Sequence, residues 1–117
     1  MSRRFRLLET GAAPAAWNMA LDAVLLEGCA RRSSPPTVRL LAFSPSAALV
    51  GAYQSAEAEL RLDYCEQQGS EVSRRVTGGG AIFFDESQVG WEVVCRFDDL
   101  DLPGRPRDAV QRLRSAP

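Results

Sequence analysis

The chain has 117 residues, of which 15 are acidic and 14 are basic, and its formal charge is −1. This length predicts one domain over residues 1–117, and the near-neutral charge argues against a nucleic-acid partner. All the basic residues are arginines, because the chain contains neither histidine nor lysine. Within these residues, the composition excludes a Ser-His-Asp triad, an HExxH zinc site, a Walker A loop and Schiff-base chemistry.

The three cysteines, Cys29, Cys65 and Cys95, are widely separated in the sequence. Their spacing fits neither a disulfide framework nor a metal site, so we expect no bound metal and a reduced, cytoplasmic location. The N-terminal residues lack the apolar run of a signal peptide. No stretch approaches the roughly 18 apolar residues of a membrane helix, so we expect no membrane partner.

The first third of the chain predicts a strand, a helix and a loop. Residues 4–9 form the strand, which Thr10-Gly11 closes. Helical spacing of apolar residues predicts a helix over 14–31, with proline in its first turn. Ser33-Ser34-Pro35-Pro36 then has the composition of a loop. The side chains that this helix is expected to bury are Trp17, Leu21, Val24 and Leu25.

Two strands are predicted next, over 37–43 and 47–53. Ser44-Pro45-Ser46 separates them and indicates a hairpin or a tight corner. A second helix is predicted over 56–68, because Ser55 can cap its N-terminus and Gly69 can end it in a left-handed conformation.

The remaining elements are predicted to be mainly strands. These cover 71–76, 81–84 and 89–97, an acidic connection follows at 98–101, and a third helix begins within 106–114. Because this last helix barely completes two turns, we expect a domain that is incomplete at its C-terminus. An incomplete domain would expose apolar surface, which predicts either a homo-oligomer or a missing C-terminal segment.

The segment with the clearest chemical content is RRVTGGGAIFFD, residues 74–85. Three consecutive glycines between two strands allow exposed backbone N–H groups to surround an anion. Arg75 can add a planar guanidinium for phosphate or carboxylate, and Thr77 can add a hydroxyl. Composition alone also allows a flexible connector with two solvated arginines, since glycine turns are common.

This segment closely resembles the signature of the lipoate–protein ligase A family. Two further segments resemble the family in the same order: WNMALDAVLL at 17–26 and TVRLLAFSPSAALVGAYQ at 37–54. The resemblance covers residues 1–97 almost without a gap. It implies an α/β fold of the α+β type, with a mixed, mainly antiparallel sheet and helices on one side, as in the biotin and lipoate ligase catalytic domain of class II synthetases.

The resemblance also implies an activity. Members of the family activate lipoate with ATP and Mg²⁺ as an acyl-adenylate, and transfer the acyl group to a lysine of a lipoyl domain. An apolar acyl chain favours an aromatic slot, and the anhydride favours hydrogen-bond donors. By position, the residues lining the acyl-adenylate site would be Arg75, Thr77, Gly78, Gly79, Gly80 and Ile82. Those flanking the acyl chain would be Phe43, Ile82 and Phe83.

Two departures from the family bear on activity. Phe84 stands where the family has a histidine, and the lysine that contacts the acyl carbonyl and phosphate in the family lies beyond the end of this sequence. No catalytic residue can therefore be named, and we expect the chain alone to lack full activity. A truncated, non-catalytic remnant or acyl-binding module is the alternative to the ligase.

A third possibility is a related octanoyl-transferase, which shares the fold and uses a cysteine nucleophile. Cys95 follows the glycine turn on a predicted strand, but no histidine or lysine is present to lower its pKa. Valines precede it, and a cysteine in such a strand is usually a core residue. The related transferases also tend to carry arginine where Gly80 stands. Asp85 and Glu86 are expected to be a solvated loop pair.

Overall fold

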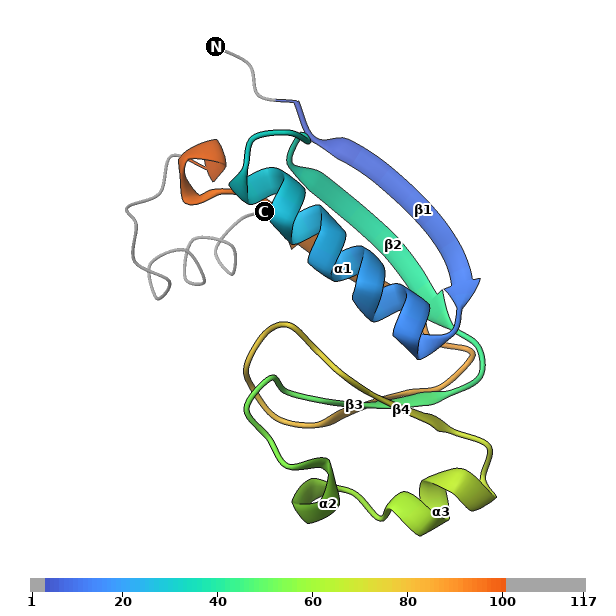
Figure 1. Ribbon diagram of the computed structural model, residues 1–117. Helices are drawn as coiled ribbons and strands as arrows, with labels where there is room; N and C mark the ends of the chain where they lie inside the picture. The colour runs from blue at the N-terminus through green and yellow to red at the C-terminus, as the bar shows by residue number, and fades with distance from the viewer. Residues whose placement is uncertain (1–3, 101–117) are drawn as a thin grey trace.

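The fold is a mixed α/β arrangement of two small sheets, seen in a computed structural model that describes residues 4–100. Figure 1 shows helix α1 lying across the first sheet, with the second sheet beneath it and α2 and α3 on the far side of the second sheet. The helices are α1 (Ala15–Ala30), α2 (Ala56–Glu59) and α3 (Leu62–Gln67), and a 3₁₀ turn covers Phe97–Leu100. The strands are β1 (Arg6–Ala13), β2 (Thr37–Phe43), β3 (Ala47–Val50), β4 (Glu71–Arg74), β5 (Ile82–Phe84) and β6 (Gly90–Val94).

The strand order is β1-β2-β6 in the first sheet and β4-β3-β5 in the second. Strand β2 pairs parallel with β1 and antiparallel with β6, while β3 pairs parallel with β4 and antiparallel with β5. The predicted mixed α/β fold is confirmed. The arrangement of the strands differs from the single, mainly antiparallel sheet that we expected. The described strands form two sheets, and parallel and antiparallel pairs are equally frequent among them.

Strands β2 and β3 belong to different sheets, so residues 44–46 form a corner and not a hairpin. The Ser44–Pro45 peptide bond at this corner is cis. Figure 1 shows the chain leaving the first sheet at the end of β2 and entering the second sheet beneath it. The corner therefore brings the end of one sheet against the start of the other.

Strand β1 continues past the point where we expected it to end. Gly11 adopts a φ of +69°, and the pairing with β2 shifts register between Glu9 and Gly11 before continuing to Ala13. Glycine allows this bulge because the left-handed conformation costs it little. The predicted end at Thr10-Gly11 is thus a bulge inside a longer strand.

Helix α1 follows Pro14 as predicted, but its buried face differs from the predicted one. Trp17 is 48% exposed and Val24 is 64% exposed, so neither is a core residue among those described. The side chains that α1 buries are Ala15, Asn18, Met19, Leu25 and Cys29. The apolar pattern predicted a different face because the observed buried face includes two polar residues. Asn18 and the mostly buried Asp22 turn inward to meet a buried charge.

The predicted helix over 56–68 is two short helices. Ser55 caps the first as expected, with its hydroxyl accepting a hydrogen bond from the N–H of Ala58. Leu60 then adopts an extended conformation, which ends α2 and separates it from α3. Gly69 has a φ of +69°, which confirms the predicted left-handed stop. The predicted helix over 106–114 lies outside the described residues.

Arg39 on β2 is fully buried, and its guanidinium joins three other elements. Its Nε donates to the Thr10 hydroxyl on β1 at 3.0 Å. On α1 it contacts the Asn18 side chain and donates to Asp22 at 2.7 Å. It also donates to Glu92 on β6 at 3.1 Å. A buried guanidinium is tolerated only when its donors are paired, and this network pairs them with both strands and the helix.

Replacing Arg39 with methionine is expected to destabilise the fold by about 3–5 kcal/mol, because Asp22 and Glu92 would lose the guanidinium that binds them both. Chemical denaturation measures this change. Arg31→Met is the matched control, since Arg31 and Glu27 form an ion pair in which both side chains are more than half exposed, and its loss is expected to cost no more than about 0.5 kcal/mol. Equal effects of the two substitutions would contradict this prediction.

Candidate functional site

The glycine turn, residues 78–80, links β4 to β5 and presents unpaired backbone donors. All three glycines are exposed, and Gly79 has a φ of +107°. Within the described residues, none of their N–H groups donates a hydrogen bond to another protein group. A run of free N–H groups in a turn of this kind attracts negative charge.

A close backbone contact holds this turn against the end of β3. A Cβ added to Gly51 would lie 2.2 Å from the carbonyl oxygen of Gly79, so only glycine fits at Gly51. Two backbone hydrogen bonds continue the contact: Arg75 N–H donates to the Val50 carbonyl at 2.9 Å, and Ala52 N–H donates to the Thr77 carbonyl at 2.8 Å. The turn is therefore anchored, and the flexible-connector interpretation does not apply.

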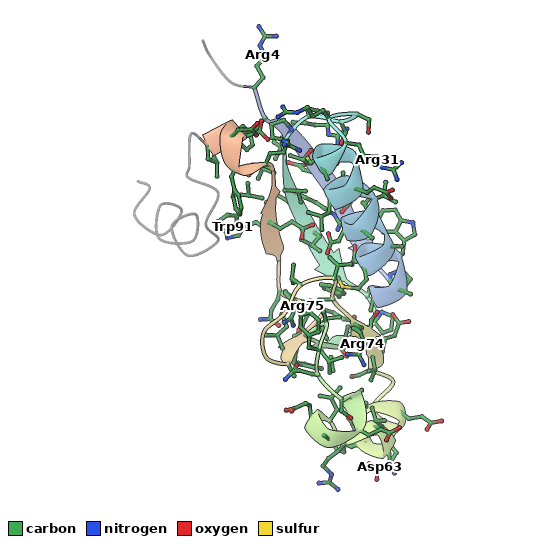
Figure 2. All side chains as sticks on the ribbon, turned by 60° about the vertical axis from the view of Figure 1, so that its left-hand side comes forward. Arg4, Arg31, Asp63, Arg74, Arg75 and Trp91 are labelled. Atoms are coloured by element: carbon green, nitrogen blue, oxygen red, sulfur yellow. The ribbon has the colours of Figure 1, made fainter. Side chains whose placement is uncertain are left out.

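The two arginines before the turn have different contacts. Arg74 donates to the carbonyl oxygens of Gly51 at 3.0 Å and Gln54, and so stabilises the loop after β3. Arg75 donates to the carbonyl oxygens of Gly78 at 2.9 Å and Leu49 at 3.4 Å. Figure 2 shows Arg75 at the level where the two sheets meet. Arg75 also lines the two cavities described next.

Two neighbouring cavities lie beside Arg75 and share Asp22 and Glu92 as lining residues. The larger has a volume of about 330 Å³ and is lined by Asp22, Leu26, Arg75, Val76, Thr77, Glu92, Val93, Val94 and Cys95. The smaller has a volume of about 130 Å³ and is lined by Met19, Asp22, Leu41, Phe43, Leu49, Arg75, Ile82, Phe84, Gly90, Trp91 and Glu92. Both combine apolar walls with a few charged groups, as small-molecule sites do.

Four of the eight predicted site residues line these cavities, whereas Gly78, Gly79 and Gly80 line neither of them. Arg75 lines both cavities, Thr77 the larger one, and Phe43 and Ile82 the smaller one. Phe43 is buried, and its ring packs against Phe84 with centroids 4.7 Å apart.

Phe83 does not join this group, because it points the other way from β5. It lines a separate cavity of about 550 Å³ beneath the second sheet, beside α3. Neighbouring residues of a strand face opposite sides, so Phe84 and not Phe83 reaches Phe43.

The sequence analysis missed Asp22 and Glu92. Their carboxylates share the guanidinium of Arg39, and burial, together with the hydrogen bond and charge of Asp22, raises the pKa of Glu92 to about 8. The available signal was Arg39 itself: an arginine at an inward position of a buried strand needs a carboxylate partner.

Cys95 is not an activated nucleophile in this arrangement. Burial first, and then the nearby Asp99 and Cys29, raise the pKa of its thiol above the usual value. None of the three cysteines is in a disulfide. Asp85 accepts hydrogen bonds from Ser87, which lower its pKa, and this pattern is that of a turn, as expected for the loop pair.

The family model for the lipoyl protein ligase A/B catalytic domain matches residues 14–115. The chain belongs to this family. Octanoyltransferase LipM from Moorella thermoacetica is 36% identical over 112 residues, which cover 96% of this chain and 41% of that protein. The chain thus spans less than half of the length of this relative.

Solved structures of lipoate ligases have the same fold. An archaeal bipartite lipoate protein ligase from Thermoplasma acidophilum, described with its E2 lipoyl domain, is 29% identical with a TM-score of 0.62; the match covers 79% of this chain and 36% of that one. A lipoate-protein ligase A bound with ATP is 30% identical with a TM-score of 0.58, over 80% of this chain and 36% of that one.

Residues 4–100 contain no helix that is long and apolar enough to cross a bilayer. No group of three or more histidine, cysteine, aspartate or glutamate side chains in this range is placed to hold a metal ion.

Gly51→Ala is expected to displace the glycine turn, because the new methyl group would overlap the Gly79 carbonyl. Gly80→Ala is the matched control, since a Cβ there meets no atom within 4 Å. We expect Gly51→Ala to lower the free energy of unfolding by about 1–3 kcal/mol and Gly80→Ala by less than about 1 kcal/mol. Chemical denaturation and amide NMR shifts of residues 77–80 measure the two effects, and similar results for both variants would contradict the prediction.

Proposed function

We propose that this chain forms the acyl-binding part of an enzyme that transfers a medium-chain acyl group to a lysine of a lipoyl domain. The observation that carries the proposal is the anchored glycine turn: its three N–H groups donate to no other protein group among the described residues, and it is hydrogen-bonded to Arg75, which lines both cavities. Family membership supports an enzyme of this kind. The lipoyl domain named with the archaeal ligase supports the same acceptor here.

The chemistry of the site suits an acyl carbonyl with an apolar tail. When a nucleophile attacks an acyl carbon, negative charge develops on the carbonyl oxygen, and fixed N–H groups or a guanidinium stabilise that charge. Gly78, Gly79, Gly80 and Arg75 supply such donors, and Thr77 adds a hydroxyl. The walls formed by Phe43 and Ile82 would hold the acyl chain.

Two acyl donors are compatible with these groups. The octanoyltransferase from Moorella thermoacetica, which is one of the relatives of this chain, supports transfer of an octanoyl group. ATP-dependent activation of lipoate to an acyl-adenylate is the second candidate, supported by the ATP-bound ligase structure. That reaction would use Mg²⁺ with ATP. Among the described residues, no group of three or more histidine, cysteine, aspartate or glutamate side chains is placed to hold a metal ion.

Arg75→Met is expected to weaken binding of octanoate to the chain by about tenfold or more, because it removes the cation nearest the glycine turn and preserves the apolar stem. Isothermal titration calorimetry measures the affinity. Arg61→Met is the control, since Arg61 is exposed and lines none of the cavities of the site. Unchanged affinity in a folded Arg75→Met protein would overturn the assignment of Arg75.

A further inference from the structure

The cavities beside Arg75 contain two carboxyl groups that the proposed function leaves unexplained. Asp22 enters from α1 and Glu92 from β6, and each lines both cavities together with Arg75. Both carboxylates bind Nη1 of the same buried guanidinium, that of Arg39, at 2.7 Å and 3.1 Å. Their side chains are only 16% and 27% exposed. Two acids therefore share one buried cation inside a site that we propose for an acyl group.

The protonation state of this pair sets the net charge of the cavity. With one proton shared by the two carboxyls, Arg39 and Arg75 leave one positive charge in excess. Without that proton, the charges of the two carboxylates and the two guanidinium groups cancel. An ionised carboxylate ligand is attracted in the first state only, whereas an uncharged acyl group experiences little difference. Charge interactions at such a partly buried site are weakly screened and therefore matter for binding.

Resting on the proposed function, we infer that the Asp22–Glu92 pair makes this cavity discriminate between ionised and uncharged acyl ligands. Holding a proton, the pair admits a free medium-chain carboxylate beside Arg75. When the pair has lost the proton, the cavity retains affinity only for uncharged acyl groups such as thioesters. The pair thus acts as a specificity determinant of the acyl site.

The direction and range of the effect follow from the titration of Glu92. Burial and the neighbouring Asp22 raise the pKa of Glu92 from 4.5 to about 8, in spite of Arg39. The charged or titratable groups around the pair are Asp22 on α1, Arg39 on β2, Arg75 after β4 and Cys95 after β6. A raised carboxyl pKa means that the proton is bound below about pH 8 and lost above it. Carboxylate binding should therefore weaken as the pH rises through that value.

The test compares octanoate with octanamide, its uncharged isostere, by calorimetry of the chain between about pH 6.5 and pH 9.5, where octanoate stays ionised. We expect the dissociation constant of octanoate to rise by about fivefold or more over this range, and that of octanamide to change by less than about twofold. A pH-independent octanoate affinity, or a parallel change for both ligands, would overturn the inference and leave the proposed function intact. Failure of both ligands to bind would overturn the proposed function itself.

Glu92→Gln tests whether Glu92 causes the pH dependence of octanoate binding, because glutamine keeps the shape of the glutamate side chain and cannot ionise. In this variant the octanoate affinity should become independent of pH and equal the low-pH affinity of the unsubstituted chain. Glu86→Gln is the control, since Glu86 is exposed and lines neither cavity, and its pH dependence should match that of the unsubstituted chain. Retention of the full pH dependence in Glu92→Gln would contradict the assignment. Circular dichroism checks folding, and the two-ligand comparison tests the inference without any substitution.

Discussion

The structure depends on one buried charge, the guanidinium of Arg39. Burial of a guanidinium is costly unless its donors are paired, and the partners here come from β1, α1 and β6. This requirement fixes how α1 lies against the first sheet and which of its faces turns inward. It also places two acids in the cavity beside Arg75, so a structural need and the charge of the candidate site have the same origin.

A second constraint is steric and acts at the point where the two sheets meet. Gly51 and Gly79 approach so closely that no side chain fits at Gly51. The contact fixes the glycine turn, whose N–H groups donate to no other protein group among the described residues. Donors fixed in advance in this way need no rearrangement when charge develops on a ligand, which is the basis of their catalytic value.

Sequence reasoning predicted what depends on local chemistry. The cap at Ser55, the stop at Gly69, the strand over Thr37–Phe43 and the glycine turn all follow from neighbouring residues. It failed where distant residues decide. The inward face of α1 was misplaced because Asn18 and Asp22 are polar and turn inward only to meet Arg39. The break after α2 and the corner after β2 likewise depend on tertiary packing. Phe83 was predicted beside Phe43 in place of Phe84 because the sequence does not assign which side chains of this strand face the core.

The two sheets share a single hydrophobic cluster, and this has a consequence for the cooperativity of the molecule. Met19 and Leu41 from the first half lie in the same cluster as Leu49 from the second, and the stacked rings of Phe43 and Phe84 span the corner between them. If the two halves separate, residues of this cluster in both sheets lose part of their packing. Local opening that separates the halves is therefore costly, and slow amide exchange should extend across both sheets.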